Sequence, residues 1–184
     1  MPQQYEAPKL TRPVDREDHT QGPANAPAVL VEYGDFECPY CGEAYPMIQQ
    51  VQRRLGDRLC FAFRHFPLTR VHPHSMQAAE AAEAAASQGR FWEMHDTLYE
   101  HQDALAMEDL KRYAADLQLD TGKFNGELDG HVYVDGIRRQ FMEGVRSGVN
   151  GTPAFFIDGE RYDGPPELEP LLRAIEDRIS RKQA

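Results

Sequence analysis

A long stretch of purely helical pattern, from residue 73 to about 147, lies between two stretches that contain β-favouring segments. Before it, the apolar runs Ala28–Tyr33 and Leu59–Phe66 read as covered strands. After it, Ala154–Ile157 reads as a strand, and Asp158-Gly159 is a two-residue hairpin signal. The order β-α-β, helical block, β-β-α predicts an α/β domain interrupted by an inserted all-helical subdomain.

Domain boundaries follow from this order. Residues 1–27 carry five prolines without apolar periodicity, so we interpret them as an extended N-terminal arm that lies over the domain or is partly disordered. Segments 28–72 and 148–184 form the α/β domain, and 73–147 form the insertion. Apolar residues at helical spacing predict helices over Pro39–Leu55, Ser75–Ser87, Phe91–Gln102, Met107–Leu117, 134–145 and 168–179.

Charge and hydropathy exclude several classes of function. The 184 residues include 30 acidic and 20 basic side chains, a net charge of −10, which argues against a nucleic-acid partner. A run of about 20 apolar residues is missing, so we expect no membrane insertion. Met1–Leu10 lacks the pattern of an export signal. We therefore expect a cytoplasmic protein, or a periplasmic or extracellular one if a signal peptide was removed.

Two of the three cysteines stand where a strand gives way to a helix. Cys38, Pro39, Tyr40 and Cys41 open the predicted helix. A helix N-terminus presents unpaired N–H groups and a partial positive charge, which stabilise a thiolate. Cys38 is therefore the predicted nucleophile, and Cys41, one turn later, the thiol that resolves a mixed disulfide. The pair predicts thiol–disulfide exchange.

A zinc site is the competing use of these cysteines. Cys38, Cys41, Cys60 and His65 have the spacing of a Cys3His site. However, Cys60 and His65 have opposite parity on one predicted strand, so they should face opposite sides of the sheet. We predict no metal and interpret Cys60 as buried packing. His72 and His74 lie at a helix entry with Ser75 as a possible cap, so we interpret them as structural.

The chain resembles the DsbA-like thiol–disulfide oxidoreductases in three features taken together, namely FECPYC at 36–41, the helical block, and GVNGTPAFFI at 148–157. The resemblance covers about residues 28–180 and implies a thioredoxin-like fold, with a central mixed sheet flanked by helices. It implies a cis peptide at Thr152-Pro153 beside the cysteines, and a substrate segment bound there with Pro39 and Tyr40. It also places Glu32 as a buried carboxylate beneath the pair, where desolvation would raise its pKa and suit proton exchange with Cys41.

This sequence departs from the family's periplasmic oxidants at the dipeptide between the cysteines. Those proteins carry Pro-His, whereas this chain has Pro39-Tyr40 and lacks a histidine that would help to hold the thiolate. Strong oxidant character is therefore not implied. Glu37 either opposes thiolate formation at Cys38 or is solvated.

We therefore predict a protein disulfide oxidoreductase whose only redox group is the Cys38–Cys41 pair, with no cofactor. Its partners would be protein or peptide thiols and disulfides, and a redox partner that recycles the pair. Two alternatives stay open. One is a glutathione-dependent transferase or isomerase of the same fold, although such relatives generally carry serine in place of Cys38. The other is a redox-switched binding module.

Overall fold

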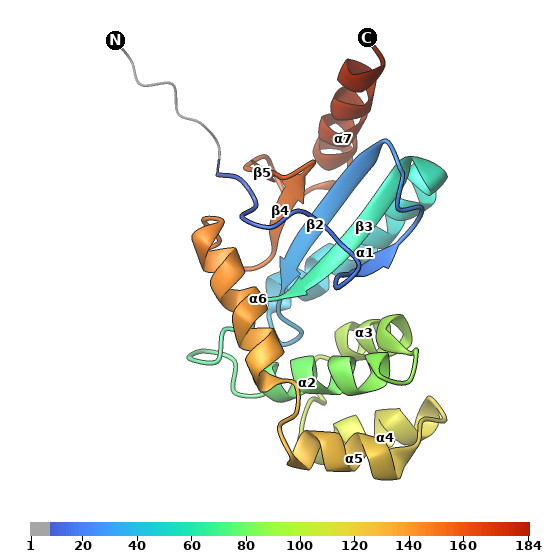
Figure 1. Ribbon diagram of the computed structural model, residues 1–184, viewed down its shortest axis with the longest axis vertical. Coiled ribbons are helices and arrows are strands. Elements are labelled where there is room, and N and C mark those ends of the chain that lie inside the picture. Colours follow the sequence, from blue (N-terminus) through green and yellow to red (C-terminus); the bar gives the residue numbers. More distant parts are fainter. Residues whose placement is uncertain (1–7) are drawn as a thin grey trace.

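The computed structural model describes residues 8–184, and part of the predicted N-terminal arm, residues 1–7, lies outside them. Its core is one mixed sheet with strand order β1-β3-β2-β4-β5. The strands are β1 (His19–Gln21), β2 (Ala28–Gly34), β3 (Leu59–His65), β4 (Ala154–Ile157) and β5 (Glu160–Tyr162). The predicted thioredoxin-like fold with inserted helices is confirmed (Figure 1).

Strands β2 and β3 form the parallel centre of the sheet, and β4 pairs antiparallel with β2. Both central strands are covered on their two faces, as their nearly continuous apolar runs predict. The β4–β5 hairpin turns at Asp158 and Gly159, both with positive φ, as the Asp-Gly signal predicts.

Helices α1 (Pro39–Leu55) and α7 (Leu168–Gln183) cover one face of the sheet. A short 3-10 turn, η1 (Gly56–Arg58), follows α1 and leads into β3. Alternate residues of β2, β3 and β4, such as Leu30 and Phe61, pack against this helical layer. Because the strand β2 runs directly into the start of α1, the cysteine pair lies at the end of the central sheet.

Most of the insertion, α2 to α5, lies beyond the ends of β2 and β3, whereas α6 runs back alongside the sheet and contacts β3 (Figure 1). Its helices are α2 (Ser75–Ala86), α3 (Phe91–Glu100), α4 (Met107–Asp116), α5 (Thr121–Asp129) and α6 (Val134–Arg146). Four of them end within two residues of the predicted limits. The helix α5 was not separately predicted, because Gly122 and Gly126 weaken its pattern; Asp120 caps it by accepting a hydrogen bond from the Lys123 amide.

Within the predicted arm, residues 8–27 lie against the sheet. Strand β1 pairs antiparallel with the edge of β3. Arg64 of β3 and Asp18 form an ion pair whose side chains are both fully buried, with Arg64 Nε 2.8 Å from Asp18 Oδ1. Arg64 also donates hydrogen bonds to the carbonyl oxygens of Arg12 and Pro13. This buried charge pair fixes the arm to the sheet.

None of the helices in residues 8–184 is both long and apolar enough to cross a membrane.

Candidate active site

Cys38 occupies the N-cap position of α1, and Pro39 is the first helical residue. Proline suits that position because the first amides of a helix have no partner within it. Cys38 is 3% exposed and Cys41 is fully buried, and both are free thiols in this structure. Between them, the side chain of Tyr40 is 67% exposed. The sequence therefore places two thiols at a helix start with an exposed aromatic ring beside them.

The pKa of Cys38 is lowered to about 5, mainly because the Cys41 thiol donates a hydrogen bond to its sulfur. Burial opposes the shift, whereas the Thr152 side chain and the backbone amides of Cys41 and Tyr40 favour the thiolate. The predicted role of the helix N-terminus is thus present, but the second cysteine contributes more. At neutral pH, Cys38 is a thiolate.

Cys41 has the opposite character. Burial and its hydrogen bond to Cys38 raise its pKa well above that of an ordinary thiol. Glu32 of β2 is 3% exposed, and burial together with the nearby Cys38 charge raises its pKa to about 8. Its Oε1 atom is buried and has no hydrogen-bond partner among the described residues. Glu32 is therefore a carboxyl group whose proton is exchangeable near neutral pH.

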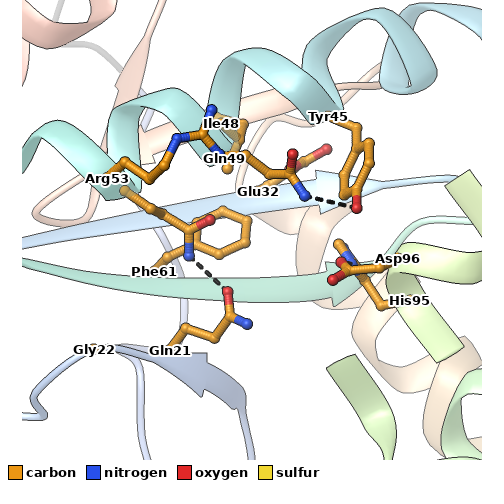
Figure 2. Close-up of a pocket in the computed structure, with 11 residues that line it drawn as sticks. Gln21, Gly22, Glu32, Tyr45, Ile48, Gln49, Arg53, Phe61, His95 and Asp96 are labelled. Atoms are coloured by element: carbon orange, nitrogen blue, oxygen red, sulfur yellow. Dashed lines mark hydrogen bonds and ion pairs between the residues drawn. The ribbon is translucent and has the colours of Figure 1, made fainter. Parts of the chain in front are cut away.

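A cavity of about 460 Å³ adjoins Glu32. Figure 2 shows Glu32 close to Gln49 and Tyr45 of α1, with His95 and Asp96 of α3 across the cavity. Gln49 donates a hydrogen bond to Tyr45 Oη at 2.7 Å, and His95 Nε2 is a second buried polar atom without a partner among the described residues. Since liquid water occupies about 30 Å³ per molecule, the cavity has room for water to solvate both groups.

The loop before β4 brings Thr152 to the cysteines. The Thr152–Pro153 peptide is cis, and the Thr152 carbonyl oxygen lies 3.5 Å from Cys38 Sγ. Thr152 Oγ1 is buried and has no hydrogen-bond partner among residues 8–184, so its hydroxyl is available to donate to the Cys38 thiolate. The structure thus brings together Cys38, Cys41, Glu32 and Thr152.

Gln102, in the segment after α3, holds the active-site loop and was not predicted from the sequence. Its Nε2 atom donates hydrogen bonds of 2.8 Å to the carbonyl oxygens of Phe36 and Cys38. A Cβ atom at Gly42 would lie 2.0 Å from Gln102 Oε1, so glycine is required there for this approach. No local pattern marks such a contact, because its partners are more than 60 residues apart.

Two histidine–carboxylate pairs hold the same loop from the other side. His72 Nδ1 lies 2.7 Å from Asp35 Oδ2, and His74 Nδ1 lies 2.8 Å from Glu37 Oε1. Glu37 also accepts a hydrogen bond from the His74 amide and its side chain is 17% exposed, so the alternative of a solvated Glu37 is wrong. That Glu37 opposes thiolate formation at Cys38 stays a prediction. Ser75 is not a helix cap: its hydroxyl donates to the His72 carbonyl oxygen inside the turn.

Cys60 is 3% exposed in β3, as predicted for buried packing. It lines a separate cavity under the N-terminal arm with Asp18 and Val29. Among residues 8–184, the cysteine pair, Cys60 and His65 do not form a metal-ligand group. The structure therefore separates the residues of the Cys3His spacing.

Comparisons with known proteins identify the family of this chain, its relatives, and solved structures with the same fold. Residues 15–177 match the model of a family described as Thioredoxin. The Na(+)/H(+) antiporter NhaA 1 of Mycobacterium sp. (strain KMS) is 45% identical over 170 residues, which are 91% of this chain and 28% of that protein. NhaA 3 of Salinispora tropica is 48% identical over 169 residues, 90% of this chain and 26% of that protein.

This chain thus spans about a quarter of the length of these curated relatives. Among solved structures, oxidised BdbD from Bacillus subtilis matches with a TM-score of 0.82 and 20% identity. The match covers 95% of this chain and 99% of that one, so the two share a fold over nearly their whole lengths.

Proposed function

The chain belongs to the thioredoxin family and has the fold of its DsbA-like thiol–disulfide oxidoreductases, and we propose that it exchanges disulfides with protein substrates through Cys38 and Cys41. The observation that carries this proposal is the opposed acidity of the two thiols. Cys38 has a pKa of about 5, whereas the pKa of Cys41 is raised well above its ordinary value. Cys38 is therefore the thiolate that attacks in the first step, and Cys41 keeps its proton until the second step, as a two-step exchange requires.

In the reducing direction, the Cys38 thiolate attacks a substrate disulfide and one substrate sulfur leaves as a thiolate. Cys41 then loses its proton and attacks Cys38 Sγ, which breaks the mixed disulfide and releases the second substrate thiolate. Two electrons pass from the pair to the substrate. The oxidising direction is the reverse of these steps.

Glu32 is the proposed acceptor of the Cys41 proton. Part of its raised pKa comes from the negative charge on Cys38. That charge disappears when Cys38 enters the mixed disulfide, so the pKa of Glu32 falls and Glu32 releases its own proton. The resulting carboxylate can then accept the proton of Cys41. The cavity beside Glu32 offers the released proton a route to solvent.

A substrate segment would bind beside Cys38 along the Thr152 backbone, as an added short strand. Tyr40 supports this placement, because its exposed ring offers apolar contact area next to the nucleophile. The relatives named as antiporters contain a match to this domain in about a quarter of their length. The antiporter names belong to those whole proteins, and our proposal for this chain concerns thiol exchange.

Turbidity of insulin in the presence of dithiothreitol tests the activity. Wild-type protein should accelerate precipitation and Cys38→Ser should not, whereas Cys60→Ser is the matched control that keeps the activity. Cys41→Ser should accumulate a mixed disulfide with substrate, detectable by mass. Equal rates for wild type and Cys38→Ser would refute the proposal.

We also propose a cytoplasmic location, in which reduction or isomerisation of disulfides is the natural direction, because a reducing compartment removes most disulfides. A recycling reductant would then keep the pair as thiols. Alkylation of the protein in intact cells, followed by mass analysis, should find Cys38 and Cys41 reduced at steady state. A pair found oxidised would instead support the oxidising direction in an export compartment.

A further inference from the structure

Two histidines and a glutamate from three distant segments meet at one point away from the cysteines. His19 of β1, His65 of β3 and Glu83 of α2 place their ligand atoms within 4.8 Å of one another. The Nε2 atoms of both histidines lie 2.8 Å from the same oxygen, Glu83 Oε1. No other group of three potential ligands was found in residues 8–184.

The two imidazole rings are held in place by aromatic neighbours. The His19 ring stacks on Phe91 with 3.6 Å between centroids and 10° between planes. The His65 ring makes edge contacts with Phe36 and Phe63. Since packing already restricts these rings, little side-chain freedom remains to be lost when a ligand binds.

The cluster carries uncompensated negative charge when both histidines are neutral. Glu83 has no lysine or arginine partner among the described residues, and its ion-pair contacts there are to the two histidines. The side chains of His19 and Glu83 are 19% and 17% exposed, which leaves an approach from solvent.

We propose that His19, His65 and Glu83 bind a divalent first-row transition cation such as Zn²⁺. Two imidazole nitrogens and one carboxylate oxygen are a ligand set that Zn²⁺ accepts, with water in the fourth position. Tetrahedral binding needs neighbouring ligand atoms about 3.4 Å apart, so each 2.8 Å contact must widen by roughly half an ångström. As the cation binds, each neutral imidazole ring gives up its Nε2–H hydrogen bond to Glu83 and carries its one proton on Nδ1 instead, so that both Nε2 atoms face the cation.

The bound cation would hold β1, β3 and α2 together, and we call this role the clasp. Strand β1 is the edge of the sheet and belongs to the N-terminal segment, β3 is central, and α2 begins the helical insertion. A single ion bound to His19, His65 and Glu83 therefore links three parts of the fold that come from separate segments of the sequence. It should stabilise the docked position of residues 8–27.

The test is a calorimetric titration of the chelator-treated protein with Zn²⁺. A Cys38→Ser/Cys41→Ser background removes the thiols that would also bind zinc. His19→Gln is the main variant, because glutamine can still donate a hydrogen bond to Glu83 but offers no imidazole. His131→Gln is the matched control: His131 Nδ1 lies 3.1 Å from Glu80 Oε1, a histidine–carboxylate pair without a second histidine.

We expect one Zn²⁺ per chain in the background protein and in the His131→Gln control, and at least tenfold weaker binding in His19→Gln. Glu83→Gln should lose binding to a similar extent, with circular dichroism showing that each variant is folded. Equal affinity in the background and His19→Gln proteins, or no zinc binding by the background protein, would overturn the proposal.

Two further measurements report on geometry and on the clasp. Co²⁺ in the same background should give the visible absorption of a nitrogen- and oxygen-bound ion, without a sulfur charge-transfer band, and a sulfur band would overturn the assignment. Zn²⁺ should slow proteolytic cleavage within residues 8–27 in the background protein but not in His19→Gln. Binding that leaves this cleavage unchanged would refute the clasp.

Discussion

The reduction potential of the Cys38–Cys41 pair should depend on pH in segments of different slope. Each proton taken up on reduction of a two-electron couple contributes about 30 mV per pH unit. Below about pH 5 both thiols are protonated in the reduced form, so the slope is about −59 mV per pH unit. Above pH 5, Cys38 is a thiolate while Cys41 keeps its proton, and the slope falls to about −30 mV.

Glu32 adds a second steep segment just below pH 8. In the reduced protein the Cys38 thiolate helps to raise the pKa of Glu32 to about 8. In the disulfide form that charge is absent, so the pKa of Glu32 is lower. Between the two values, reduction adds one proton to Glu32 as well as one to Cys41, and the slope returns to about −59 mV. Above pH 8 it is again about −30 mV.

The assay is equilibration with a dithiol reference couple from pH 4 to 9, followed by acid quench and mass analysis of trapped thiols. Glu32→Gln should keep the change near pH 5 but lose the steep segment below pH 8. A constant slope of about −59 mV through pH 5 would refute the acidic Cys38. Identical curves for wild type and Glu32→Gln would refute the coupling of Glu32 to the pair.

Three further outcomes follow from the contacts around the pair and the arm. Thr152→Val should raise the pKa of Cys38 by roughly one unit, because it removes a hydroxyl available to the thiolate, whereas Thr152→Ser should leave this pKa unchanged. A pH series of alkylation rates measures the pKa. Gln102→Leu removes the side-chain donor to the Phe36 and Cys38 carbonyl oxygens, of which the Cys38 oxygen still accepts the Gly42 amide. It should lower the free energy of urea unfolding by about 1–3 kcal/mol, and an unchanged value would contradict this role. Asp18→Asn leaves the buried Arg64 charge unpaired and should cost about 3–5 kcal/mol in the same measurement, whereas a loss below 1 kcal/mol would show that solvent reaches Arg64.

The fold could be predicted largely because its elements carry local signals. The apolar run of β2, the helical stripe of α1 with Gly56 after it, and the Asp158-Gly159 turn each specify a structure within a few residues. Strand β1 carries no such signal. It has three residues in a proline-rich segment, and its pairing depends on β3, which is about 40 residues later.

The same distinction applies to the candidate site. A motif marks Cys38 and Cys41, and the resemblance to the DsbA-like oxidoreductases marks Glu32 as a buried carboxylate beneath them. Gln102 and His72 were not assigned to the site, because their role is a contact with the loop that only the folded chain forms. Sequence patterns identify the reacting groups here, whereas the groups that position them depend on tertiary packing.

The carboxylates near the cysteines explain why Glu32 alone is suited to carry a proton. Asp35 contacts His72, and Glu37 contacts His74. Glu32 has no such partner among the described residues, and its Oε1 atom accepts no hydrogen bond. A buried carboxyl group without a compensating charge keeps its proton to higher pH. Its proton affinity then follows the charge on Cys38, which is present in the reduced pair and absent in the disulfide.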